Sequence, residues 1–133
     1  MFKSLIINLS VHTDGRGNLT AVESNIDIPF EIKRVYYMYG IPAMQERGTH
    51  AHKELEQLVI AVAGSFEIRL DNGKTVTTTV LDDPAKAVYV PRMYWRTLQN
   101  FSNDAVCLVL ASALYDESDY YRNYEEFKSA LNA

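Results

Sequence analysis

Residues 56–81 read EQLVIAVAGSFEIRLDNGKTVTTTVL and predict three β-strands in succession. Val, Ile, Phe and Thr, which favour pleated structure, are frequent in residues 56–63, 65–70 and 75–81. Gly64 separates the first two runs, and Asn72-Gly73 lies between the second and the third. Asn-Gly between two strands is the strongest short-range signal of a β-hairpin. The stretch therefore predicts a β-hairpin preceded by a further strand.

Similar runs recur on both sides of this stretch, separated by turn residues. Their spacing is typical of an all-β sandwich or barrel. The period changes only in the tail, where apolar residues at three- and four-residue spacing predict an amphipathic helix over residues 118–131, with Ser118 as its N-cap. Further strands are predicted at residues 3–9, 19–23, 31–39, 87–90, 94–99 and 105–112.

Composition limits the class of protein. A chain of 133 residues with 47% hydrophobic and 23% charged residues predicts one globular domain, residues 1–133. The net charge of −4 argues against binding to nucleic acid, which normally needs a basic excess. No apolar stretch approaches the ~20 residues that span a bilayer, and no signal-peptide pattern is present, so we expect a cytoplasmic protein without membrane contact. Cys107 is the only cysteine, and its apolar neighbours predict a packed core thiol.

Residues 47–57, RGTHAHKELEQ, contain two of the three histidines of the chain. In a strand His50 and His52 project from the same face, because residues two apart do so. Imidazole suits proton transfer near neutral pH, since its unperturbed pKa is about 6.5. The pair is either a solvated pair on a polar strand face or an acid–base pair in a site. Arg47 and Gly48, which supply a fixed charge and allow close backbone approach, favour the site.

The same segment resembles the first motif of the cupin superfamily, in which Gly, His-x-His and Glu precede a strand that ends in Gly. The matching residues are Gly48, His50, His52, Glu56 and Gly64. The resemblance implies an all-β fold, a cupin-type β-barrel or jelly roll, to which the sequence adds a short C-terminal helix.

The second cupin motif bears on metal binding. It matches at Pro91 and Asn100, but Met93 replaces its glycine and Arg96 replaces the histidine that is a metal ligand in metal-binding cupins. A guanidinium stays protonated and has no lone pair to offer, so it would repel a divalent cation. We therefore expect no metal and no other cofactor. A zinc site with three protein ligands is the alternative.

Several stretches narrow the resemblance to one family, the dTDP-4-keto-6-deoxyglucose 3,4-ketoisomerases. Their order and spacing carry the resemblance, which covers nearly the whole chain. It implies an isomerase that moves the carbonyl of a dTDP-linked sugar from C4 to C3 through an enediol. The product would supply an aminotransferase that makes a 3-amino-3,6-dideoxyhexose for a surface polysaccharide or an antibiotic. The matching stretches are residues 28–37, 47–53, 108–112 and 115–124, with the turn at residues 14–19.

The resemblance also assigns site residues. It implies that His50 and His52 are the catalytic histidines and that Tyr36 is the catalytic tyrosine. We expect His50 to take the C3 proton and to return one at C4, while His52 and Tyr36 handle the oxygen protons. General acid–base groups can do this without metal or organic cofactor.

Four arginines are predicted to bind the substrate. Arginine binds phosphate oxygens in bidentate fashion, so Arg34, which shares a strand face with Tyr36, and Arg47, just before the histidines, are candidates for the diphosphate. Arg16 and Arg96 occupy positions that differ between family members with galacto- and gluco-configured products. Arg16 favours the galacto product.

Two other functions stay open. A related nucleotide-sugar epimerase would remove a similar proton but keep its carbonyl at C4. A non-catalytic sugar-binding cupin would bind the nucleotide sugar without turnover. The ketoisomerase family is dimeric, and the strand-like N-terminus and the aromatic residues of the tail predict a homodimer here.

Overall fold

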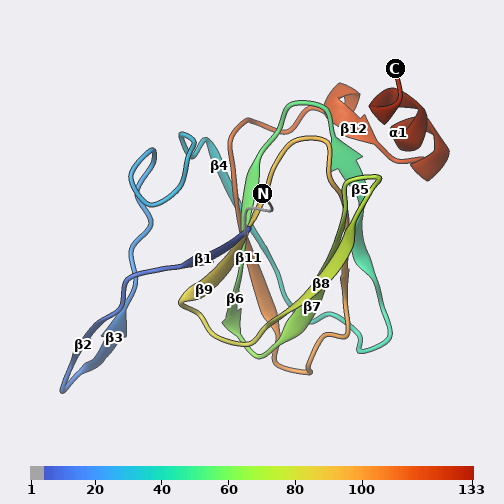
Figure 1. The fold of residues 1–133 in the computed structure, drawn as a ribbon. Coiled ribbons are helices and arrows are strands. Elements are labelled where there is room, and N and C mark those ends of the chain that lie inside the picture. Colours follow the sequence, from blue (N-terminus) through green and yellow to red (C-terminus); the bar gives the residue numbers. More distant parts are fainter. Residues whose placement is uncertain (1–4) are drawn as a thin grey trace.

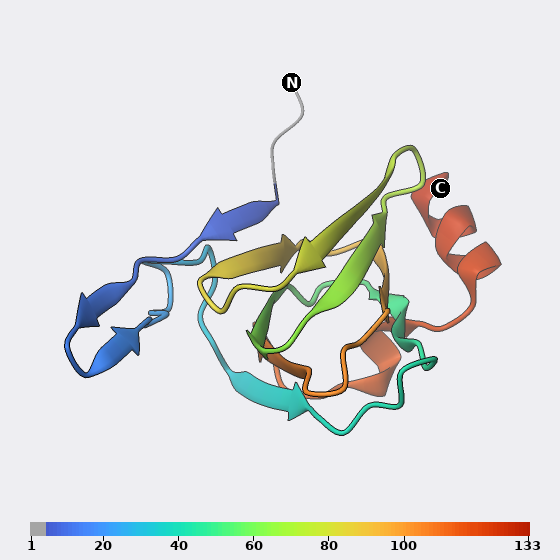
Figure 2. The same ribbon diagram turned by 90° about the horizontal axis from the view of Figure 1, so that it is seen from below.

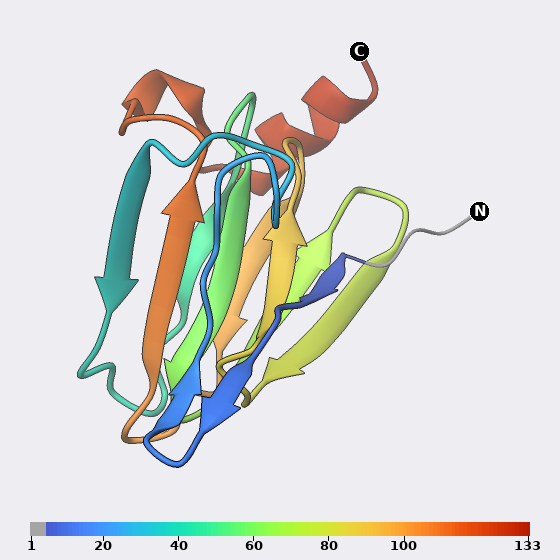
Figure 3. The ribbon, with the colours of Figure 1, turned by 90° about the vertical axis from the view of Figure 1, so that its left-hand side faces the viewer.

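The computed structural model describes residues 5–133 and consists of two five-stranded antiparallel sheets that face each other (Figures 1 and 3). This confirms the predicted all-β, cupin-type fold with a short C-terminal helix. The first sheet has the order β1 (Ile6–Asn8), β9 (Lys86–Val90), β6 (Gln57–Ala63), β11 (Val106–Ala111) and β4 (Arg34–Met38). The second has the order β12 (Tyr120–Tyr121), β5 (Arg47–His52), β10 (Trp95–Gln99), β7 (Phe66–Asp71) and β8 (Val76–Leu81).

The stretch from β6 to β8 forms the strands that it predicts. β7 and β8 pair antiparallel around Asn72-Gly73, and Gly73 has a φ of +90°, which favours glycine. β6 and β7 belong to different sheets, so the chain crosses between the sheets at Gly64. Gly64 has a φ of +62°, and a Cβ there would lie 2.8 Å from Cα of Ala105. Glycine is therefore required at this crossing.

The N-terminal segment differs from the prediction in part. The strand predicted at residues 3–9 forms at β1, and residues 3 and 4 lie outside the described residues. The strand predicted at residues 19–23 is wrong. Instead, β2 (His12–Asp14) and β3 (Gly17–Leu19) form a hairpin that projects from the two sheets (Figure 2). The Asp14 side chain accepts the backbone N–H of Arg16 at 2.8 Å, which closes the turn early.

Apolar side chains fill the space between the two sheets. Phe66, Ile68 and Leu70 alternate along β7, and all three are buried in this core. Cys107 of β11 lies in the same core, and burial raises the pKa of its thiol to about 12. The prediction of a packed core thiol is confirmed.

The C-terminal segment contains less helix than predicted. η1, a 3₁₀ turn (Glu117–Asp119), and β12 precede the helix α1, which spans only Tyr124–Leu131. Asn123, and not Ser118, is the N-cap of α1, since its side chain accepts the N–H of Glu126 at 3.1 Å. The apolar periodicity predicts a helix that begins at residue 118. Residues 120–121 are extended instead, because the backbone of β12 pairs with β5.

The helix α1 packs on the strand that carries the histidine pair. Phe127 is fully buried against Trp95 and Ala51, and Ala51 lies between the two histidines on β5. α1 and the β2–β3 hairpin lie on opposite sides of the sheets (Figures 1 and 2). No helix within residues 5–133 is long and apolar enough to cross a bilayer.

Candidate active site

His50 and His52 lie together on the inner side of the second sheet. They are 9% and 1% exposed, and their Nε2 atoms are 3.0 Å apart. β5 is held between β10 and β12, and its two-residue period puts both rings on one face. The predicted same-face pair is confirmed. A solvated pair on a polar strand face is excluded, because both residues are buried.

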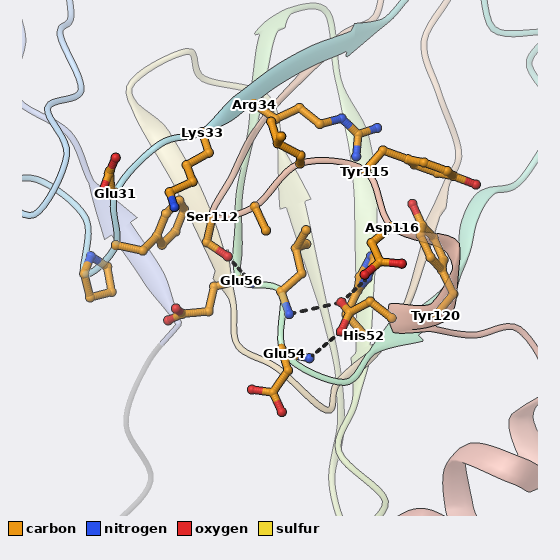
Figure 4. A pocket seen from close by; sticks show the side chains of 16 residues that line it. Glu31, Lys33, Arg34, His52, Glu54, Glu56, Ser112, Tyr115, Asp116 and Tyr120 are labelled. Carbon is orange, nitrogen blue, oxygen red and sulfur yellow. Dashed lines mark hydrogen bonds and ion pairs between the residues drawn. The ribbon is translucent and has the colours of Figure 1, made fainter.

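His52 is anchored by a carboxylate from the C-terminal segment. Its Nδ1 lies 3.2 Å from Oδ2 of Asp119. The same carboxylate accepts the backbone N–H of Glu54 at 2.9 Å and that of Leu55 at 3.2 Å (Figure 4). The ring of Tyr120 covers His52, with 4.3 Å between the ring centroids. Both ring nitrogens of His52 therefore have partners inside the protein.

Tyr36 of β4 is held by a chain of hydrogen bonds that begins at Arg96 of the opposite sheet and passes through Gln57 of its own sheet. Arg96 donates to Oε1 of Gln57 and, at 3.0 Å, to the carbonyl oxygen of Tyr94. Because the amide oxygen of Gln57 faces the guanidinium, its Nε2 donates to the Tyr36 hydroxyl oxygen at 3.0 Å. The hydroxyl proton of Tyr36 remains available for another acceptor. Burial raises the pKa of Tyr36, while the Gln57 hydrogen bond and the Arg96 charge oppose this shift.

A cavity of about 330 Å³ between the sheets brings most of the predicted site residues together. Its lining includes Tyr36, His50, Arg34, Arg47 and Arg96. His52 does not line this cavity. It borders a neighbouring pocket of about 810 Å³, in which Glu31 and Lys33 lie across from His52 and Tyr120 (Figure 4).

Arg16 is placed elsewhere by the fold. It lies in the turn of the projecting β2–β3 hairpin, where its side chain is 92% exposed and forms an ion pair with Asp14 at 2.9 Å. Figures 1 and 2 show this hairpin outside the two sheets. Within one chain, Arg16 is therefore not part of the cavity.

Three arginines give the cavity a positive charge that no carboxylate neutralises. Among residues 5–133, Arg34, Arg47 and Arg96 form no ion pair. Arg96 is 3% exposed, and within the same residues its Nε is the only buried side-chain nitrogen or oxygen without a hydrogen-bond partner. Burial lowers the pKa of Arg96 to about 10, which still leaves it protonated at pH 7. Such an interior favours an anionic ligand or a reaction in which negative charge develops.

Both histidines are neutral at pH 7. Burial lowers the pKa of His50 to about 2 and that of His52 to about 3, and the nearby Arg96 charge acts in the same direction. A neutral imidazole can accept a proton, so His50 is available in the cavity as a base.

This burial predicts a loss of stability in mild acid. The unfolded chain takes up protons on these histidines below about pH 6.5, whereas the folded chain does not until far lower pH. The free energy of unfolding should therefore fall by about 2 kcal/mol per histidine between pH 7 and pH 5. Urea denaturation at the two pH values measures this. The double variant His50→Asn/His52→Asn should lose this part of the pH dependence, and an unchanged dependence would contradict the assignment.

The donor set does not suit a metal ion. Nε2 of His50 faces Nε2 of His52, and the Arg96 guanidinium lies in the same interior. Glu56, which matched the cupin glutamate, instead accepts a hydrogen bond from the Tyr89 hydroxyl. No group of three or more His, Cys, Asp or Glu side chains within residues 5–133 could hold a metal. The zinc alternative therefore lacks its third ligand.

Sequence reasoning missed four residues of the site: Gln57, Asp119, Tyr120 and Arg122. Gln57 is a buried polar residue at the start of an otherwise apolar strand, and this contrast was an available signal. The other three fall within the residues predicted to be helical. Asp119 and Tyr120 reach His52 only because β12 pairs with β5, and the Arg122 guanidinium stacks on Tyr120 at 4.2 Å. No local pattern indicates that pairing.

The barrel thus encloses a polar interior in which a neutral imidazole, a phenol and unpaired guanidinium groups meet. The fold and this interior define a cupin-type protein whose chemistry is proton transfer on an anionic ligand.

Comparison with known proteins identifies the family. Residues 2–132 match the FdtA family, described as WxcM-like, C-terminal. A TDP-4-oxo-6-deoxy-alpha-D-glucose-3,4-oxoisomerase from Aneurinibacillus thermoaerophilus is 46% identical over 126 residues, which are 95% of this chain and 91% of that protein. The chain therefore belongs to the FdtA family and is an isomerase of the 3,4-ketoisomerase type.

Solved structures agree with this assignment. A 3,4-ketoisomerase from Helicobacter canadensis has 44% identity and a TM-score of 0.94, with 96% of each chain covered. A mutant of QdtA from Thermoanaerobacterium thermosaccharolyticum, solved in complex with TDP-4-keto-6-deoxyglucose, has 39% identity and a TM-score of 0.93, with 96% of this chain and 92% of that chain covered. The rmlC epimerase of Mycobacterium tuberculosis, at 16% identity and a TM-score of 0.73 over 87% of this chain and 66% of that one, shares the fold alone.

Proposed function

We propose that this protein is a 3,4-ketoisomerase that acts on dTDP-4-keto-6-deoxy-D-glucose and moves its carbonyl from C4 to C3. The observation that carries the proposal is the cavity in which neutral His50 and the hydroxyl of Tyr36 lie among three arginines that have no ion-pair partner within residues 5–133. The relatives that act on this sugar support the choice of substrate.

In the first half of the proposed reaction, His50 takes the proton from C3. The C3–H electron pair forms the C3=C4 double bond, and the carbonyl π electrons move to O4. O4 takes the phenolic proton of Tyr36, which gives an enediol. The hydrogen bond from Gln57 and the charge of Arg96 stabilise the phenolate that remains.

The second half reverses these roles on the neighbouring carbon. The Tyr36 phenolate takes the O3 proton, the C3=O3 carbonyl forms, and the C3=C4 pair takes a proton from His50 at C4. Both side chains return to their starting states, so the cycle needs no metal or organic cofactor. Each acid–base group of this kind contributes typically ~10²–10⁴-fold to the rate.

Arg34 and Arg47 are the proposed ligands of the diphosphate. Both line the cavity, and neither forms an ion pair within residues 5–133. Arg96 is engaged with Gln57 and Tyr94, so we assign it to the sugar, where its fixed charge faces the developing enediolate. The sequence predicts that His52 handles oxygen protons, and this role changes in the proposal. Both nitrogens of His52 have protein partners, so it contacts His50 and does not act on the substrate oxygens.

The test is incubation of the purified protein with dTDP-4-keto-6-deoxyglucose in deuterated water, followed by NMR. We expect a new sugar whose carbonyl is at C3. A product that keeps its carbonyl at C4 would identify an epimerase, and binding without turnover would identify a sugar-binding protein. Either result would reject the proposal.

The product is the precursor required by an aminotransferase that makes a 3-amino-3,6-dideoxyhexose, and we assign the reaction to the cytoplasm. The galacto configuration of the product stays a prediction.

We further propose that the protein is a homodimer. The outer face of the first sheet has a groove of about 600 Å³ in which Val35 and Val62 are 54% and 40% exposed. Apolar grooves of this kind on soluble proteins mark interaction surfaces. A second copy is the proposed occupant, because the β2–β3 hairpin follows β1, the edge strand of the same sheet, and its strands pair only with each other among residues 5–133.

Light scattering coupled to size-exclusion chromatography tests the homodimer. We expect twice the chain mass of 15.1 kDa. The variant Val62→Glu puts a charge into the groove and should shift the mass toward one chain, whereas Val76→Glu, on exposed β8, should not. A single-chain mass for the unmodified protein would reject this proposal.

A further inference from the structure

The carboxylate of Asp119 is held in a fixed position beside the histidine pair. Its Oδ1 accepts the N–H of Glu54, and its Oδ2 accepts the N–H of Leu55. The backbone of Asp119 is fixed as well, because its carbonyl oxygen accepts the N–H of Lys53 at 2.9 Å. The side chain is 15% exposed. A group held by this many bonds does not have to reorganise when charge appears next to it.

The hydrogen-bond network assigns the tautomers of both histidines. A carboxylate accepts hydrogen bonds and donates none, so the hydrogen between Asp119 and His52 belongs to Nδ1 of His52. Neutral imidazole carries one N–H, so Nε2 of His52 is a lone pair. Across the 3.0 Å contact, Nε2 of His50 must then carry the hydrogen. Nδ1 of His50 is left as the base, and it has no hydrogen-bond partner within residues 5–133.

We propose that Asp119 is a positioning residue of the isomerase, which fixes the tautomer of His52 and thereby joins His50, His52 and Asp119 into one proton relay. The inference rests on the proposed function. When Nδ1 of His50 takes the C3 proton, its Nε2 passes a proton to Nε2 of His52. His50 stays neutral, and His52 becomes an imidazolium against the Asp119 carboxylate. Protonation of C4 reverses both transfers, so no proton is gained or lost.

The relay moves the positive charge to the histidine that contacts a carboxylate. His50 pairs directly with Arg96 across β5 and β10, and it has no carboxylate within hydrogen-bond distance among residues 5–133. An imidazolium at His50 would therefore face a buried guanidinium without a carboxylate in hydrogen-bond contact. His52 is the next residue of the relay, and it contacts Asp119. The arrangement lets His50 act repeatedly as a neutral base.

The variant Asp119→Asn tests the relay. With its amide oxygen in the place of Oδ1, it still accepts the N–H of Glu54. Its amide nitrogen then takes the place of Oδ2, where it loses the hydrogen bond from Leu55, donates to Nδ1 of His52 and forces the other tautomer. We expect kcat for the ketoisomerase reaction to fall by at least about 100-fold, with KM changed by less than about threefold, because ground-state binding does not use Asp119. ¹⁵N NMR of the histidine rings should show hydrogen on Nδ1 of His52 in the unmodified protein and on Nε2 in the variant.

Asp116→Asn is the matched control. Asp116 lies three residues earlier, and among residues 5–133 its side chain accepts hydrogen bonds only from Ser118 and forms none with either histidine. Its backbone carbonyl oxygen, which accepts the N–H of Asp119, is kept in the variant, so kcat and both tautomers should be unchanged. The NMR measurement on the unmodified protein needs neither substrate nor a folded variant. Hydrogen on Nε2 of His52 there would overturn the relay. An active variant that keeps more than a third of kcat would also overturn it while leaving the proposed function intact, whereas an inactive unmodified protein would reject the proposed function instead.

Discussion

Replacement of His50 by Asn is expected to lower kcat for the ketoisomerase reaction by at least about 1,000-fold. Asn has no basic nitrogen, so it cannot take the C3 proton. His50 is the only histidine among the residues that line the cavity, so no second imidazole can replace it. Binding should survive, because Arg34 and Arg47 remain in place. The measurements are turnover by NMR at saturating substrate and the affinity for dTDP by calorimetry, which we expect to change by less than about threefold.

The third histidine provides a matched control. His12 lies exposed on β2, outside the cavity, so His12→Asn should retain its turnover. Loss of dTDP binding in His50→Asn would assign that residue to binding and not to proton transfer. Turnover within about tenfold of the unmodified protein would remove His50 from the mechanism.

The second large effect is expected for Tyr36→Phe, which should lower kcat by about 100-fold or more. The phenyl ring keeps the shape of the side chain and its stacking with Arg34. Only the hydroxyl is lost, and with it the proton that O4 needs as the C3 proton leaves. The Nε2 group of Gln57 would also lose its acceptor. Turnover and the rate of C3 proton exchange in deuterated water should both fall, since both require the enediol.

Tyr37→Phe is the control on the adjacent position. The alternation of β4 turns Tyr37 outward, where it is 61% exposed, so removal of its hydroxyl should leave kcat unchanged. If Tyr36→Phe reduced turnover while leaving C3 exchange at its original rate, Tyr36 would act only after the enediol forms. Equal effects of the two variants would contradict a specific role for Tyr36.

The helix at the C-terminus illustrates where sequence reasoning failed. Its apolar period begins at Tyr120 and continues through Phe127, but the residues before Tyr124 are extended or form a 3₁₀ turn. The periodicity shows only which residues are apolar. It cannot show that the edge of β5, a distant part of the chain, forms backbone hydrogen bonds with β12. The misassigned residues include Asp119, and for this reason its role was not predictable from the sequence.

The glutamate that matches the cupin motif lies outside the cavity. Glu56 follows the histidines at the expected spacing, yet it turns toward Tyr89, and the next residue, Gln57, enters the cavity. The alternation of β6 puts adjacent residues on opposite faces, so a difference of one residue exchanges a carboxylate for an amide. The amide then connects Arg96 to Tyr36.

The sequence by itself determined most of the strands, the turn at Asn72-Gly73, the shared face of His50 and His52, and the family, because these depend on local propensity, on the two-residue period and on ordered motifs. Only the tertiary structure decided which groups meet. It buried both imidazoles and thereby made them neutral, it brought Asp119 to His52 from 67 residues away, and it left Arg16 outside the cavity. Such effects arise from pairing between distant strands and from loss of solvent, and neither is encoded in any short stretch of the chain.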